Sequence, residues 1–235
     1  KIRAYYDERV KDGEGDHHEL VEPGAFRDVL DTGVYCGGII DRKSGHLHPL
    51  NLCLGEARAA KSLGVEIYED SAVIEMKGGA KPVARTARGR VEAGSIVLGG
   101  DTSHQFERGR LWGLQFPTGS YIIATEPLSD NLARSINPRD LAICDSNIVL
   151  DYFRMSGDRR MIFGGRCNYS NRDPHDITAT MKTRLDEIFP QLSDKKVDYT
   201  WAGRIGIVLN RVPAIGRMEP NLYYMQGYCG HGVNA

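Results

Sequence analysis

Apolar residues in the first half of the chain first recur with the period of a helix and then form a short run typical of a strand. Residues 50–63 (LNLCLGEARAAKSL) carry apolar side chains three or four positions apart, and Gly64 comes directly after them. This spacing predicts an amphipathic helix that ends before the glycine. The apolar run at residues 65–68 predicts a strand, and YCGGIID at residues 35–41 predicts another. A strand, a helix of this length and a second strand are typical of an α/β crossover unit.

Four short strands, separated by glycines and charged turns, are predicted after this unit. The last of them, SIVLGG at residues 95–100, is an apolar run that ends in two glycines. Such a run is typical of a buried parallel strand whose carboxyl end meets a ligand at close backbone approach. The other three are SAVIEMKGG (residues 71–79), PVARTARG (82–89) and RVEAG (90–94).

From Gly119 onward the pattern changes to longer strands, which together predict an antiparallel sheet. One helix is predicted among them at residues 176–189. The preceding RDPHD supports its start, because a proline and acidic residues are favoured at the beginning of a helix. A short helix is also predicted beside Pro23, in GAFRDVLD. The strands are predicted in SYIIATEP (120–127), NIVLDYFRMS (147–156), RRMIFGGR (159–166), KVDYTWAGRIG (196–206) and NLYYMQGY (221–228). The chain therefore reads as two connected lobes, one α/β and one antiparallel.

Composition narrows the classes of partner. Thirty Lys and Arg residues against 31 Asp and Glu residues leave a net charge of -1, so no strong field attracts nucleic acid or an anionic membrane. No apolar run approaches the roughly 20 residues of a membrane-spanning helix, and Lys1 opens a polar stretch without a signal-peptide core. The five cysteines include no C-x-x-C pair and are expected to be free thiols. These features predict a soluble cytoplasmic protein.

Two pairs of residues are ambiguous candidates for chemistry. His46 and His48 in GHLHP would share one face of an extended backbone, but no third ligand at a recognisable spacing completes a metal site. Turn and helix-entry roles are favoured for them, and no metal is predicted. Tyr152 and Arg154 fall on one face of the strand in DYFRMS, which either lines a pocket or belongs to an ordinary half-buried sheet.

The stretch GYCGHGVNA at residues 227–235 is the sharpest local signal. In Gly230-His231-Gly232 two residues lack a side chain, so backbone N–H groups can point at a ligand atom. A helix that begins after Asn234 would add its positive end to the same place. Such a loop suits an anion or a developing negative charge, although a glycine-rich turn is by itself weak evidence. The sequence contains neither G-x-G-x-x-G nor a P-loop motif.

Seven segments in order along the chain carry a family resemblance. They are GHLHPLNLCLGEA, SYIIATEPLS, LDYFRMSGDRRMIFGG, RDPHD, FPQL, NRVPAIGR and YYMQGYCGHGVNA. Over about residues 20–235 the chain resembles the FAD-dependent D-amino-acid oxidase-like flavoproteins, and within them the gamma-glutamylputrescine oxidoreductase group. The resemblance implies an α/β fold with α+β character. Part of an FAD-binding domain of dinucleotide type would be interleaved with an antiparallel-sheet substrate domain.

The resemblance also implies how the chain is divided. Residues 1–48 would be a substrate-domain segment, 49–110 an FAD-domain segment, 111–205 the antiparallel substrate domain, and 206–235 the return to the FAD domain. In the family, an N-terminal Gly-rich βαβ unit seats the FAD pyrophosphate and a C-terminal helix follows the GHG loop. This sequence carries no counterpart of either element, so we expect the FAD site of residues 1–235 alone to be incomplete.

Cofactor-binding positions carry over from the family residue by residue. Val73 corresponds to a backbone contact with the adenine part of FAD. Gly99 and Gly100 correspond to the strand end beside FAD, where this chain reads GGDTSH and relatives more often place a small residue with Gly and Asn. The wall around the isoalloxazine would be formed by Ile205, Gly206, Gly230, His231, Gly232 and Val233. Tyr152 and Arg154 would border the substrate, and no catalytic residue is assigned.

The chemistry implied by the resemblance is oxidation of a C–N bond in an amine such as gamma-glutamylputrescine. Hydride passes from the carbon bearing the amine to flavin N5, the imine hydrolyses, and oxygen or another acceptor reoxidises the flavin. Cys229 stands where relatives often have Ser and is expected to be a free thiol, not a covalent flavin link.

The resemblance leaves two alternatives open. One is an oxidase or dehydrogenase of D-amino acids or N-methyl amino acids, and the other is a catalytically inactive fragment that acts as a binding module. Amino-acid oxidases of the superfamily tend to carry an Arg for the α-carboxylate where this chain has Ile205 and Gly206. Arg204 lies one position earlier, so in an extended segment its side chain points to the opposite face.

Overall fold

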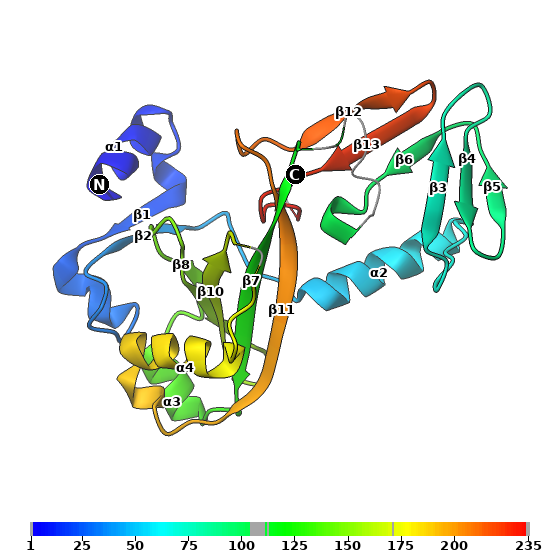
Figure 1. The fold of residues 1–235 in the computed structure, drawn as a ribbon. Helices are drawn as coiled ribbons and strands as arrows, with labels where there is room; N and C mark the ends of the chain where they lie inside the picture. The colour runs from blue at the N-terminus through cyan, green and yellow to red at the C-terminus, as the bar shows by residue number, and fades with distance from the viewer. Residues whose placement is uncertain (1, 104–110, 112, 171, 234–235) are drawn as a thin grey trace. The chain divides into compact units, whose positions relative to one another are not determined.

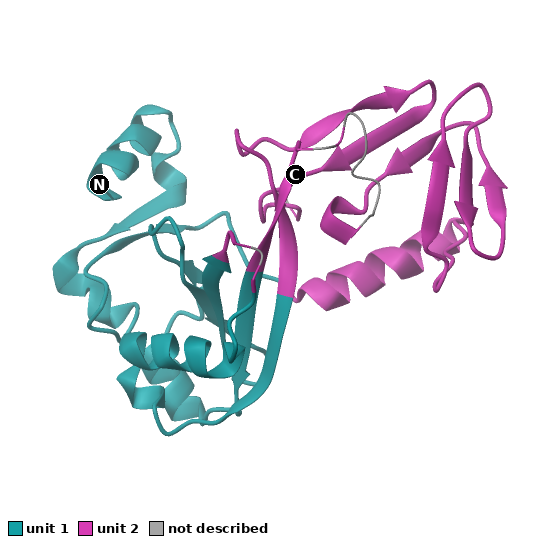
Figure 2. Ribbon diagram, viewed as in Figure 1, with its two compact units in different colours: residues 1–47, 120–167, 173–202 teal, residues 48–119, 168–172, 203–235 magenta. Residues whose placement is uncertain are grey.

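The computed structural model describes residues 2–103, 111, 113–170 and 172–233, which form two compact units. Each unit is assembled from three separate segments of the chain (Figure 2). Unit 1 comprises residues 1–47, 120–167 and 173–202, and unit 2 comprises residues 48–119, 168–172 and 203–235. The predicted interleaving of two lobes therefore has a structural counterpart in the order of the segments. Which unit serves the cofactor and which the substrate stays a prediction.

A five-stranded sheet dominates unit 1 (Figure 1). Its strand order is β11-β7-β10-β9-β8, and both β8 and β10 pair with β9 in the antiparallel sense. The strands are β7 (Phe116–Thr125), β8 (Ile143–Cys144), β9 (Tyr152–Met155), β10 (Met161–Asn168) and β11 (Val197–Ile207). The antiparallel sheet predicted for this part of the chain is confirmed for these strands. NLYYMQGY was predicted in the same sheet, but it forms β13 (Leu222–Gln226) in a separate sheet, where it also pairs in parallel with β6 (Ile96–Leu98).

Two α-helices and a 3-10 helix accompany this sheet: α3 (Asp130–Ile136), α4 (Ile177–Ile188) and η5 (Pro190–Leu192). The Ser129 hydroxyl accepts a hydrogen bond from the Leu132 amide, and the Asp176 carboxylate accepts one of 2.9 Å from the Ala179 amide. Both residues therefore act as N-caps. The helix predicted at residues 176–189 is confirmed.

The core of unit 1 lies between one face of the sheet and these helices. Alternate residues of the strands point into it, as the two-residue period of a strand requires. The ring of Phe153 packs edge-on against Phe189, with 5.0 Å between the centroids. The fully or nearly fully buried members are Tyr121, Ile123, Phe153, Met155, Met161, Phe163, Ile136, Met181, Leu185 and Ile188. Tyr152 and Arg154 alternate with the buried positions of β9 and are half-buried on the opposite face.

The N-terminal part of unit 1 consists of a hairpin and short helices. The strands β1 (His18–Val21) and β2 (Gly38–Asp41) pair in the antiparallel sense. Around them lie α1 (Ile2–Lys11), η1 (Gly15–His17) and η2 (Pro23–Asp28). The short helix predicted beside Pro23 is therefore present, as a 3-10 helix.

Unit 2 contains two three-stranded sheets and one long helix. The first sheet has the order β12-β13-β6, with β13 and β6 parallel, and the second has the order β3-β4-β5. The elements are α2 (Pro49–Ser62), β3 (Val73–Lys77), β4 (Val83–Thr86), β5 (Arg90–Glu92), β6 (Ile96–Leu98), η3 (Asp101–Ser103), β12 (Ala214–Glu219) and β13 (Leu222–Gln226). The parallel pairing predicted for SIVLGG is confirmed, although only Leu98 of β6 is buried.

The helix predicted at residues 50–63 is confirmed as α2, and Gly64 follows it with a φ of +89°. The strand predicted at residues 65–68 is wrong, because within the described residues this segment pairs with no other strand. The predicted crossover unit is wrong too, since β2 belongs to an antiparallel hairpin in unit 1. A short apolar run becomes a strand only where a neighbour satisfies its backbone groups.

No helix within the described part of the chain is long and apolar enough to cross a membrane.

The first prediction concerns Glu19 on β1. Arg139 donates to its two carboxylate oxygens at 2.8 and 3.0 Å, and Arg42 donates to one of them at 3.0 Å. These bonds, Arg139's first, lower the pKa of Glu19 to about 2. Glu19→Gln should lower the melting temperature at pH 7 by roughly 1–3 °C.

Because the pKa of Glu19 is lowered on folding, its contribution is complete above the unfolded value of 4.5 and is lost as the pH falls toward about 2. The difference between the melting temperatures of wild type and variant should therefore shrink over that range. Glu8→Gln is the control, because Glu8 is an exposed carboxylate on α1. A difference that does not change with pH would contradict the assignment.

The second prediction concerns Gly164, which faces Tyr152 across the β9–β10 pair. A Cβ atom at position 164 would overlap the Tyr152 ring and come within 2.6 Å of the phenol oxygen. Gly164→Ala should therefore lower the free energy of unfolding by about 1–3 kcal/mol. In urea titrations, Gly157→Ala should stay within about 0.5 kcal/mol of wild type, because nothing lies within 4 Å of a Cβ there. Equal stability of the two variants would refute the close packing.

Candidate functional site

Two of the segments assigned to the flavin wall meet in unit 2. The amide of Cys229, in the loop after β13, donates to the carbonyl of Gly206 near the end of β11 at 2.9 Å. A Cβ atom on Gly230 would lie 3.9 Å from Cδ1 of Ile205. The structure therefore brings Gly230 to Ile205 and Gly206, which precede it by 25 and 24 positions in the sequence.

The rest of this loop is exposed. Gly230 has a φ of +88°, which favours glycine, and the His231 amide donates to the Tyr228 carbonyl at 2.9 Å. His231, Gly232 and Val233 are all exposed. A Cβ atom on Gly232 would approach Tyr228 no closer than 3.6 Å, so this glycine is not required by local packing. Asn234 and the predicted start of a following helix lie outside the described residues.

Asp101 brings the end of β6 to the same place. It follows Gly99 and Gly100, which are both exposed. Its carboxylate accepts hydrogen bonds from the amides of Gly206 at 3.0 Å and Gly227 at 2.7 Å. Sequence reasoning did not assign Asp101 a role. The available signal was the motif GGDTSH, in which an acidic residue directly follows two glycines at the end of a predicted strand.

The side chain of Cys229 also forms hydrogen bonds at the base of this loop. Its side chain is buried, and its Sγ atom accepts a hydrogen bond from the Val208 amide at 3.4 Å and donates one to the Gly227 carbonyl at 3.3 Å. Among the described residues the thiol forms no disulfide. Its hydrogen bonds show that it contributes to the conformation of the loop.

Val73 and the histidine pair have different surroundings. Val73 begins β3 in the separate β3-β4-β5 sheet, and its contact with the adenine part of a cofactor stays a prediction. The His48 ring accepts a hydrogen bond from the Asn51 amide at the start of α2, which is the helix-entry role favoured from the sequence. Within the described residues no group of three or more His, Cys, Asp or Glu could hold a metal ion.

The residues of the loop fit the edge of a planar cofactor. The main chain from Gly230 to Gly232 is exposed, and nothing lies within 4 Å of a Cβ atom at Gly99. In contrast, the backbone of Gly206 is closely covered, since a Cβ atom there would lie 2.5 Å from the Asp101 carboxylate. Exposed glycines beside a tightly packed support are suited to close backbone approach by a ring.

The predicted substrate residues lie in unit 1. Tyr152 Oη and Ser120 Oγ share a hydrogen bond of 3.0 Å, and burial raises the pKa of the Tyr152 phenol. The Arg154 guanidinium donates to the Met155 carbonyl at 3.4 Å. Tyr152 is therefore a neutral phenol that Ser120 holds on the sheet face opposite the core, and the substrate role of both residues stays a prediction.

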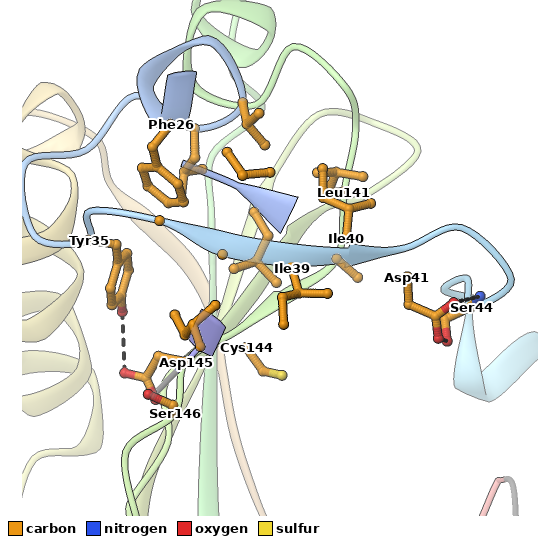
Figure 3. Close-up of a pocket in the computed structure, with 18 of the residues that line it drawn as sticks. Phe26, Tyr35, Ile39, Ile40, Asp41, Ser44, Leu141, Cys144, Asp145 and Ser146 are labelled. Atoms are coloured by element: carbon orange, nitrogen blue, oxygen red, sulfur yellow. Dashed lines mark hydrogen bonds between the residues drawn. The ribbon is translucent and has the colours of Figure 1, made fainter. Parts of the chain in front are cut away.

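A cavity of about 990 Å³ in unit 1 was not foreseen from the sequence (Figure 3). Apolar side chains of η2, β2 and residues 141–143 surround it, including Phe26, Ile39, Ile40 and Leu141. The Tyr35 hydroxyl, at its edge, donates to Asp145 at 3.3 Å. Neither Tyr152 nor Arg154 lines this cavity, which is therefore separate from the predicted substrate face.

Comparison with known proteins agrees with the resemblance. Gamma-glutamylputrescine oxidoreductase of Escherichia coli (strain K12) is 40% identical to this chain over 217 residues, which are 92% of the chain and 51% of that protein. The chain thus spans about half the length of the curated relatives it matches.

Solved structures share the fold at low sequence identity. Glycine oxidase from Geobacillus kaustophilus matches 97% of this chain and 61% of its own, with a TM-score of 0.77 and 16% identity. L-Proline dehydrogenase from P. horikoshii matches 95% of this chain and 62% of its own, with a TM-score of 0.75 and 18% identity. The family model DAO, FAD dependent oxidoreductase, matches residues 1–235. The chain therefore belongs to the DAO family of FAD-dependent oxidoreductases.

Proposed function

We propose that the natural protein containing this chain oxidises a C–N bond of a primary amine carried on a longer polar molecule, such as gamma-glutamylputrescine, with FAD as the cofactor. The observation that carries this proposal is the 40% identity, over 92% of the chain, to an enzyme of that name. The oxidant that restores the cofactor would be oxygen or another electron acceptor. FAD supplies the two-electron acceptor that side chains lack.

The residues of this chain would bind and orient the reactants. Ile205, Gly206 and the loop from Gly230 to Val233 would form the wall beside the flavin ring. Apart from the His231 amide, which donates to the Tyr228 carbonyl, the N–H groups of the loop would favour negative charge at the ring edge. Tyr152 and Arg154 would border the substrate, with the phenol of Tyr152 held neutral and oriented by Ser120.

The end of β11 supports an amine over a free amino acid. The strand continues without interruption to Ile207, so Arg204 and Ile205 point to opposite faces. A side chain at Gly206 would collide with Asp101, so an arginine cannot occupy that position in this packing. A guanidinium placed for an α-carboxylate is therefore not provided by residues 205 and 206.

Assays on the natural protein also distinguish two alternative functions. An oxidase or dehydrogenase of D-amino or N-methyl amino acids would prefer substrates with an α-carboxylate. A catalytically inactive binding module would show no flavin absorbance after purification of the natural protein.

For the location of the protein in the cell we propose the cytoplasm. All five cysteines lie within the described residues as free thiols, which is typical of a reducing compartment.

The third prediction is a substrate preference. The natural protein should turn over gamma-glutamylputrescine with a kcat/KM at least about tenfold above those for D-alanine, glycine and sarcosine. The physical reason is the lack of an arginine for the α-carboxylate at positions 205 and 206. Side-by-side steady-state assays measure it. A clear preference for any of the three amino acids would replace the proposal with the amino-acid oxidase alternative.

The fourth prediction concerns the loop. Gly232→Val should change the free energy of unfolding by no more than about 0.5 kcal/mol, because the new Cβ atom meets only ordinary contacts. The same variant should slow flavin reduction at least about tenfold, since a β-branched side chain blocks backbone approach. Gly94→Val, at an exposed glycine with open space around it, is the matched control. Normal flavin reduction in Gly232→Val would mean that the loop is only a turn.

A further inference from the structure

We propose that Asp101 is a positioning residue, whose carboxylate fixes the flavin-facing loop relative to the end of β11. That the loop faces a flavin rests on the proposed function, whereas the hydrogen bonds of Asp101 are contacts within unit 2. Asp101 Oδ2 accepts from the Gly206 amide at 3.0 Å, and Oδ1 accepts from the Gly227 amide at 2.7 Å. We call this arrangement the carboxylate bridge. Hydrogen bonds to an ionised acceptor are roughly twice as strong as neutral ones.

The carboxylate bridge closes a ring of contacts at the base of the loop. The Cys229 amide donates to the carbonyl of Gly206, and the Cys229 thiol donates to the carbonyl of Gly227. Asp101 binds the amides of the same two glycines. The main chain just before Gly230 is therefore held by hydrogen bonds with both Asp101 and Cys229. Of these two side chains, Asp101 carries the negative charge.

The packing around the carboxylate bridge leaves no room for side chains on either glycine. A Cβ atom on Gly206 would come within 2.5 Å of Asp101 Oδ1. Gly227 has a φ of +74°, and a Cβ atom there would overlap Val208. Gly206 is thus required by the close approach of Gln115 and Asp101, and Gly227 by its positive φ and the Val208 side chain.

Two unfavourable features accompany the carboxylate bridge. Asp101 has a φ of +45°, which is uncommon for a residue with a side chain. Gln115 donates its Nε2 to the Asp101 carbonyl at 3.0 Å, but its Oε1 atom is buried with no partner among the described residues. Strained conformations and unsatisfied polar atoms cluster at functional sites, where the surrounding structure imposes them. Their coincidence at Asp101 points to a role beyond local stability.

An asparagine could reproduce only part of this arrangement. Its side chain has one carbonyl oxygen, so it would accept from one of the two amides and place its NH₂ group against the other N–H. Asp101→Asn is therefore a graded test, and Asp101→Ala removes both acceptors. Asp70→Ala is the matched control, because Asp70 also has a positive φ, of 50°, but is exposed.

The experiment measures hydrogen–deuterium exchange and FAD binding in the natural protein. In Asp101→Ala, peptides that contain the amides of Gly206 and Gly227 should exchange at least about tenfold faster than in wild type. The dissociation constant for FAD should rise by about tenfold or more, with a changed visible spectrum of the bound flavin. Asp101→Asn should give intermediate values, and Asp70→Ala should match wild type.

Two outcomes would overturn the proposal. One is unchanged exchange in Asp101→Ala, and the other is faster exchange with FAD affinity and spectrum within twofold of wild type. If Asp101→Ala does not fold, Asp101→Asn decides by the same criteria. Wild-type protein that binds no FAD would instead contradict the proposed function, and exchange alone would then decide whether the carboxylate bridge holds the loop.

Discussion

The hydrogen bonds from Asp101 to Gly206 and Gly227 join residues 105 and 126 positions apart in the sequence. In unit 2 they bring the end of β6, the end of β11 and the loop after β13 to one place. A side chain at Gly206 would collide with Gln115 and Asp101, and one at Gly227 would collide with Val208, so this packing requires glycine at both positions. The exposed stretch from Gly230 to Val233 begins where these contacts end, and its accessibility follows from the rigidity of its base.

Unit 1 depends on a different constraint, the one-sided burial of its sheet. Helices α3 and α4 cover one face, and burial of Phe153, Phe163 and their neighbours fixes the register of the strands, because a slip by one residue would expose them. The opposite face then carries Tyr152 and Arg154 by alternation. Gly164 lets the ring of Tyr152 lie flat against β10, where Ser120 orients its hydroxyl.

Elements that carry their own local signals were predicted correctly, and elements without such signals, or those that depend on a pairing partner, were not. Helix α4 was predictable because it carries its own signals, with Asp176 as N-cap and a stripe of buried residues. Helix α1 was not predicted, since none of its residues is buried and no apolar stripe marks it. Residues 65–68 resemble a strand in composition, but hydrogen bonding to a neighbour decides whether such a run becomes one.

The sequence by itself determined most of the local elements, the alternation that separates Tyr152 from the core, and the family to which the chain belongs. It also predicts close backbone approach of a ligand at the GHG loop, and this stays a prediction. Only the tertiary structure decided that Asp101 joins this loop to Gly206, that the Cys229 thiol faces inward, and that a cavity lies beside η2. The reason is that these features depend on contacts between residues far apart in the chain, which no local period or propensity encodes.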